Sequence, residues 1–103
     1  MKMFLISDNV DTRIGMRLVG VQGVINHTRE EIEKSFDLVL NDPEVAVVLI
    51  TVNLSSMVSD LIDSIRLNYE RPLIVEIPDR HMSRLSDARI AKYIREAVGM
   101  SLD

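Results

Sequence analysis

Side chains that could do acid–base or nucleophilic chemistry are few in this sequence and lie far apart. Asp8 follows the apolar run Lys2–Ser7, a position at which open α/β sheets gather ligands and catalytic groups. The two histidines, His27 and His81, could act as general bases, but His27 adjoins a predicted helix cap and His81 lies in a polar loop. Both fit surface or turn positions, so the pattern favours a recognition protein over an enzyme.

A phosphoryl-accepting receiver is disfavoured by the residues that follow the predicted strands. Receivers of response regulators hold a metal with paired acids after the first strand and accept phosphate on an aspartate after the third. Here Asp8 has no paired acid, the acceptor position reads Thr51-Val52-Asn53, and no lysine ends a later strand. Asp8 and Asn9 are better explained as residues that shape the turn or cap the first helix.

The sequence also lacks the residues that phosphate-binding loops, nucleophilic triads and thiolate sites require. Gly15, Gly20 and Gly23 are separated by four and two residues, which fits neither a Walker motif nor a dinucleotide fingerprint. The serine cluster at Ser55–Ser59 has no histidine and acid at a recognisable spacing. The chain has no cysteine, which excludes disulfides and cysteine nucleophiles. We therefore expect no catalytic residue, no metal site and no cofactor.

The elements that would position these residues alternate between strands and helices. Four apolar runs predict strands at Lys2–Ser7, Gln22–Asn26, Val45–Val52 and Leu73–Pro78. The first and third are almost wholly apolar, which is typical of central strands in a parallel sheet, whereas the other two fit edges. Right-handed crossovers give the order 2-1-3-4 in a small doubly wound, Rossmann-like or receiver-like α/β fold with helices on both faces. Asp8, Asn9 and residues 51–53 should converge where the two central strands end.

Two helices are predicted in the first half of the chain. The first covers Thr12–Val19, and Ile14 and Leu18 keep helical spacing along it. The second begins after Thr28, because Thr28 and Glu31 have the spacing of a capping box.

Two more helices are predicted after the third strand. One runs from about Leu54 to Glu70, with Met57 on its apolar face and Ser55 on its polar face. The last covers Ser86–Val98. One apolar stripe of this segment consists of Leu85, Ala88, Ala91, Ile94 and Val98, and a second flank of Ile90, Tyr93 and Ala97. So wide a surface indicates either a helix wedged deeply in the fold or a helix that meets another protein.

Length and composition predict one domain over residues 1–103, with a sheet core at 1–78 and a loop and C-terminal helix at 79–103. The net charge of −4, with bases mixed among acids, disfavours nucleic acid as a partner. No apolar run approaches the ~18 residues of a membrane span, and the first residues are unlike a secretory signal. A cytoplasmic location follows as an expectation.

Four stretches together resemble a known family. They are Ser7–Val21, Val48–Thr51 leading a helix, Pro72–Pro78, and Lys92–Gly99. In order, spacing and total length they are similar to the F subunit of the V-type and archaeal-type (A-type) rotary ATPases, and the similarity spans nearly the whole chain. Each stretch alone is mostly apolar strand plus turn, so the specificity comes from their combination.

The resemblance implies a small doubly wound protein of the central stalk that has no catalytic residue. It would bind the long coiled-coil protein of that stalk, the D subunit, contact other subunits of the rotary ATPase, and turn with the rotor. It would thereby help couple ATP hydrolysis or synthesis to proton or sodium transport, and reach the inner face of the membrane only through the complex. The expected partner-binding residues are Arg17, Leu18, Val21, Ile90, Tyr93 and Ala97.

Two alternatives remain open at this point. One is a small-ligand or regulatory binding domain of receiver-like fold that uses the rim formed by Asp8, Asn9 and Asn53. The other is an enzyme with Asp8 or His81 as its acid–base group.

Overall fold

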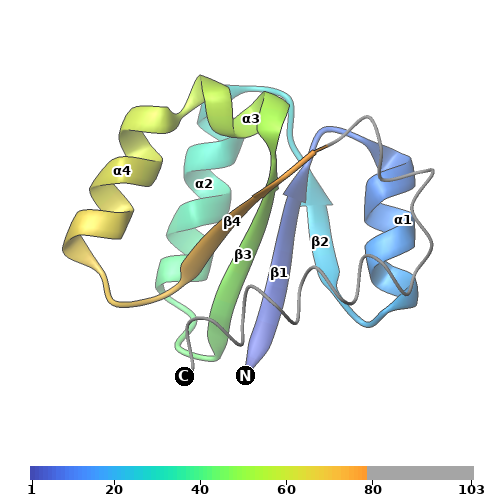
Figure 1. Ribbon diagram of the computed structural model, residues 1–103, viewed down its shortest axis with the longest axis horizontal. Coiled ribbons are helices and arrows are strands. Elements are labelled where there is room, and N and C mark those ends of the chain that lie inside the picture. Colours follow the sequence, from blue (N-terminus) through green and yellow to red (C-terminus); the bar gives the residue numbers. More distant parts are fainter. Residues whose placement is uncertain (79–103) are drawn as a thin grey trace.

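The fold is a four-stranded parallel sheet with helices on both faces (Figure 1). A computed structural model describes residues 1–78. The strands are β1 (Lys2–Ser7), β2 (Gln22–Ile25), β3 (Val45–Thr51) and β4 (Leu73–Ile77), in the order β2-β1-β3-β4. The predicted order and the edge positions of β2 and β4 are confirmed. Three strands end one residue earlier than predicted.

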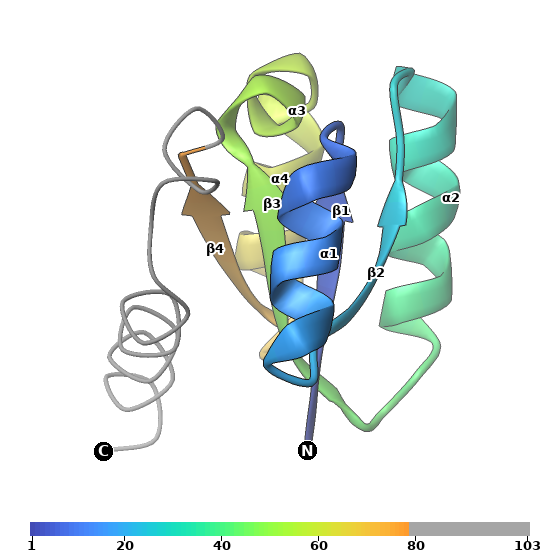
Figure 2. The ribbon, with the colours of Figure 1, turned by 90° about the vertical axis from the view of Figure 1, so that its right-hand side faces the viewer.

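The helices divide between the two faces of the sheet (Figure 2). They are α1 (Val10–Leu18), α2 (Arg29–Leu40), α3 (Val52–Met57) and α4 (Ser59–Asn68). Helices α2, α3 and α4 pack on one face around Ile6, Val48 and Ile50. On the other face, α1 packs through Met16 on a second core cluster that includes Leu5 and Leu49. The predicted doubly wound arrangement is therefore present.

The two most decisive local patterns form as predicted. The Thr28 side chain accepts a hydrogen bond from the Glu31 backbone N–H at 3.2 Å, and the Glu31 carboxylate accepts one from the Thr28 backbone N–H at 3.1 Å. This capping box satisfies amide groups that a helix N-terminus leaves without intrahelical partners. All residues of β3 except Ala46 are buried, as expected for an uncharged, β-branched central strand.

The prediction of one helix between Leu54 and Glu70 is wrong. The helix is interrupted at Val58, whose φ of −132° is not helical, and this break separates α3 from α4. The Val58 side chain at the break is fully buried, whereas Met57, predicted on the apolar face, is 44% exposed. Ser55, predicted on the polar face, is buried, and its hydroxyl donates to the Val52 carbonyl at 3.0 Å. The buried residues keep helical spacing through the break, so helical periodicity alone does not reveal it.

Candidate functional site

Helix α1 begins two residues earlier than predicted because Asn9 caps it. The Asn9 Oδ1 accepts hydrogen bonds from the backbone N–H groups of Asp11 at 2.8 Å and Thr12 at 3.2 Å. Ser7 holds the cap in place, since its hydroxyl accepts from the Asn9 backbone N–H at 2.9 Å. The predicted role of Asn9 as a cap is confirmed, and these bonds fix where α1 leaves β1.

Helix α1 ends in a Schellman motif. The backbone N–H of Gly20 donates to the Arg17 carbonyl at 3.0 Å, and that of Val21 donates to the Met16 carbonyl at 2.9 Å. This pattern requires a left-handed residue after the cap, and Gly20 has a φ of +88°. Hydrogen bonds therefore fix both ends of α1, at the exit from β1 and at the turn toward β2.

The outward face of α1 is apolar. Thr12 and Met16 are the buried residues of the helix. Val10, Ile14 and Leu18, spaced four residues apart, lie on the opposite side with 52%, 51% and 72% of their surfaces exposed. We call these three residues the α1 ridge. A contiguous exposed apolar strip on a small domain is typical of a surface that another protein covers.

Two arginines lie beside the α1 ridge, on the flank next to the edge strand β2. Arg13 and Arg17 line a shallow hollow of about 270 Å³ together with Gln22 and Gly23. Within residues 1–78, neither guanidinium forms an ion pair. The flank of the ridge therefore carries two positive charges that have no acidic partner in the part of the chain that the structure describes.

The structure divides the residues that the sequence suggested for partner binding. Arg17 and Leu18 lie together on the exposed side of α1. Val21 is buried and packs with Met16 in the core beneath the helix. Ile90, Tyr93 and Ala97 lie outside the described residues.

The sequence interpretation missed Val10 and Arg13 as surface candidates. The three ridge residues recur every four residues, which is also the spacing of a buried stripe. Met16, which lies on the opposite side of the helix, was the available signal that a second apolar side existed.

Asp8 at the carboxyl ends of β1 and β3 is held by neighbouring side chains. Its Oδ1 accepts from the Thr51 hydroxyl at 3.1 Å, and its Oδ2 accepts from the Asn53 amide at 3.4 Å. The predicted convergence of these residues is confirmed, while the Asn9 side chain is used as the helix cap. The rim that the ligand-binding alternative requires is thus engaged in internal hydrogen bonds.

The other polar side chains considered as catalytic or metal-binding candidates either form hydrogen bonds with the backbone or lie far from one another. The Ser56 hydroxyl donates to the Val52 carbonyl at 2.9 Å, as the Ser55 hydroxyl does. Among the described residues, no three histidine, aspartate or glutamate side chains are grouped so that they could hold a metal ion. His81 lies outside the described residues.

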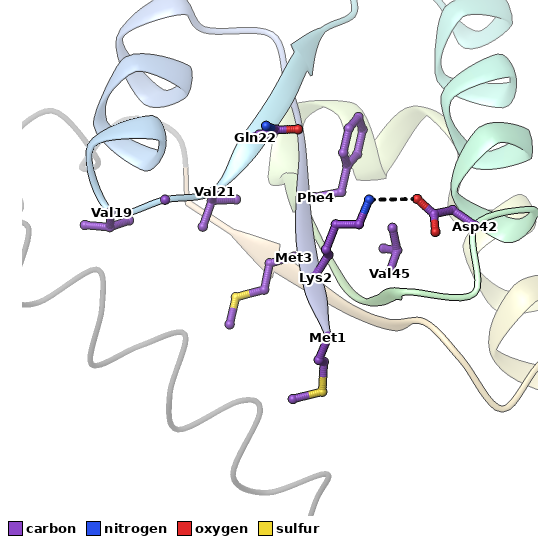
Figure 3. A pocket seen from close by; sticks show the side chains of 10 residues that line it. Met1, Lys2, Met3, Phe4, Val19, Val21, Gln22, Asp42 and Val45 are labelled. Atoms are coloured by element: carbon purple, nitrogen blue, oxygen red, sulfur yellow. Dashed lines mark hydrogen bonds and ion pairs between the residues drawn. The ribbon is translucent and has the colours of Figure 1, made fainter.

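A hollow of about 740 Å³ lies at the opposite end of the sheet, where the strands begin (Figure 3). Met3, Val19 and Val21 contribute apolar side chains to it. Its charged residues Lys2 and Asp42 form an ion pair at 3.2 Å, and the Glu44 backbone N–H and Lys2 together lower the pKa of Asp42. Ligand sites of open α/β sheets lie at the carboxyl ends of the strands, so this hollow is poorly placed to be one.

The fold and the α1 ridge define a small doubly wound α/β domain with an exposed apolar surface. The chain matches the family model of the ATP synthase (F/14-kDa) subunit over residues 3–97. It is 30% identical over 103 residues to the F subunit of the A-type ATP synthase of Methanocaldococcus jannaschii, covering 99% of each chain. It is 31% identical over 108 residues to the corresponding protein of Pyrococcus abyssi, covering 99% of this chain and 98% of the relative.

The chain therefore belongs to the family of ATP synthase (F/14-kDa) subunits. The resemblance noted in the sequence is confirmed over nearly its full length. Members of this family are non-catalytic subunits of rotary ATPase complexes, so the protein is not an enzyme by itself. No helix within residues 1–78 is long and apolar enough to span a membrane.

Proposed function

We propose that this protein is a central-stalk, or rotor, component of an A-type or V-type ATP synthase/ATPase. It binds the coiled-coil D subunit, contacts other subunits, and helps couple ATP hydrolysis or synthesis to proton or sodium transport. The observation that carries the proposal is the family match over residues 3–97, because it covers nearly the whole described fold and continues beyond it. The protein would be cytoplasmic and peripheral at the inner face of the membrane.

The physical demands of such a role agree with the described structure. A protein that transmits torque needs a stiff body and a partner surface, and it needs no pocket of its own. Stiffness comes from cores on both faces of the sheet, in which residues such as Leu5, Ile6 and Ile50 are fully buried. The α1 ridge supplies an exposed surface on that body.

The binding surface that we propose has two parts. The first is α1, where Arg17 and Leu18 contact the partner directly, while Val21 acts from beneath by fixing the end of the helix. The second is the C-terminal segment with Ile90, Tyr93 and Ala97, carried forward from the sequence. Residues 1–103 act as one domain in this proposal.

Co-expression with the coiled-coil D subunit of the same organism tests the function. Size-exclusion chromatography with light scattering should show a stable one-to-one complex. Two chains that are each folded and do not associate would overturn the proposal.

The C-terminal part has a separate test. Truncation after Leu85 should abolish binding or destabilise the fold. A truncated chain that stays folded and binds as tightly as the full chain would remove residues 86–103 from the proposed surface.

A further inference from the structure

The electrostatics of α1 specify the chemistry of its partner more closely than the proposed function does. The first and last of the three ridge residues are eight residues apart, which is about 12 Å along the helix axis. A helix that covers this strip would remove three large aliphatic side chains from water. The apolar contact alone, however, does not distinguish one apolar helix from another.

Arg13 and Arg17 are exceptional among the cations of the described chain. They are one turn apart on the same flank of the ridge, above Gln22 and Gly23 of β2. Neither has an acidic partner within residues 1–78. The other described cations are engaged by carboxylates or by backbone carbonyls, and they are Lys2, Arg29, Lys34, Arg66 and Arg71.

The charge of the rest of the protein makes this flank selective. The chain carries a net charge of −4, so its overall charge disfavours the approach of an acidic partner. Near α1 the same partner meets two guanidinium groups, each able to bind a carboxylate through two hydrogen bonds. Like-charge repulsion elsewhere and attraction at α1 would together fix where and in which orientation the partner docks.

We infer that α1 docks an α-helix whose apolar stripe is flanked, on the side facing β2, by aspartate or glutamate residues. The apolar stripe of that helix packs against the ridge residues Val10, Ile14 and Leu18. Its carboxylates form ion pairs with Arg13 and Arg17. The inference rests on the proposed function, in which that helix belongs to the coiled-coil partner. It adds that the partner helix is acidic and that its acidic residues lie on the side facing β2.

Two matched pairs of variants test the inference in the complex with the D subunit. Arg17→Glu and Lys34→Glu make the same charge change on exposed helix surfaces. Within residues 1–78, Lys34 forms only an exposed ion pair with Glu30. Leu18→Ser and Leu38→Ser remove equally exposed side chains, since each is 72% exposed. Equal melting temperatures within each pair establish that the variants are folded.

Dissociation constants measured at low and high salt give the result. Arg17→Glu and Leu18→Ser should each weaken binding about tenfold or more, while the two α2 variants change it less than about twofold. The Arg17→Glu effect should shrink as salt rises, whereas the Leu18→Ser effect should persist. Binding that is unaffected by both α1 variants, or equally affected by the α2 variants, would overturn the inference while leaving the proposed function intact. Absence of any complex with the unaltered chain would instead refute the proposed function.

Discussion

Adding one methyl group at two different glycines should change stability in opposite directions. Gly23 of β2 pairs with Leu5 of the central strand β1. A Cβ at residue 23 would lie 2.6 Å from the Leu5 Cβ and 2.8 Å from the Leu5 carbonyl oxygen. Leu5 is fully buried and its carbonyl belongs to the backbone, so the neighbouring atoms cannot move aside cheaply. Gly23→Ala must therefore push β2 away from β1 or distort the strand.

The magnitude follows from the cost of overpacking. Extra volume forced into a packed core costs about 1–3 kcal/mol. For a domain of this size, each kcal/mol corresponds to roughly 4–8 °C in melting temperature. Gly23→Ala should consequently lower the melting temperature by at least about 4 °C.

Gly15→Ala is the matched control because it makes the same substitution in open space. Gly15 lies inside α1, and nothing is within 4 Å of the position that its Cβ would occupy. Alanine is favoured over glycine in a helix interior by roughly 0.5–1 kcal/mol, so this variant should melt about 2–8 °C higher than the unaltered protein. Thermal unfolding followed by far-UV circular dichroism measures both. A Gly23→Ala variant as stable as the unaltered chain would refute the close approach of β1 and β2.

Three further outcomes are expected. Thr28→Ala should lower the free energy of unfolding by about 0.5–2 kcal/mol in denaturant titrations, because the capping box is lost. Arg71→Met should cost more, roughly 2–4 kcal/mol in the same assay, since the guanidinium donates to three backbone carbonyls from the end of α2 to the start of β3. Stability should also fall on acidification. The pKa of Asp60 is lowered chiefly by Arg29, and that of Asp42 by the Glu44 N–H and Lys2. Because these pKa values are lower in the folded state, their stabilisation is present above about pH 4 and is lost as the pH falls below it. Unfolding midpoints that stay constant from about pH 5 to about pH 2 would contradict this assignment.

The sheet was predictable because its strands carry redundant signals. Residues Val45–Thr51 are uncharged and mostly β-branched, without a polar alternation. Both faces of such a strand must be buried, which is typical of a central position in a parallel sheet. The order of the strands then follows from right-handed crossovers between parallel neighbours, which leave few arrangements. The convergence of Asp8 with Thr51 and Asn53 was a consequence of that topology.

The break at Val58 was not predictable from periodicity. Leu54 and Ile62 lie on the same side of a continuous helix, and both are indeed buried. The sequence pattern therefore fits one helix and two helices equally well. Whether one or two helices form depends on the space available for packing beside β3, which is a property of the assembled fold.

The rotation of α1 was undetermined for a related reason, and it matters more because the candidate surface depends on it. Ile14 and Leu18 fit a buried stripe, yet Thr12 and Met16 occupy that side of the helix. Local hydrophobicity favours the first solution, whereas the cap at Asn9 and the turn at Gly20 favour the second by fixing both ends. A protein that exposes its more apolar face gains nothing from it in isolation. The exposed residues should therefore tolerate polar substitution with little loss of stability and with a large loss of binding, the opposite of what a core stripe would show.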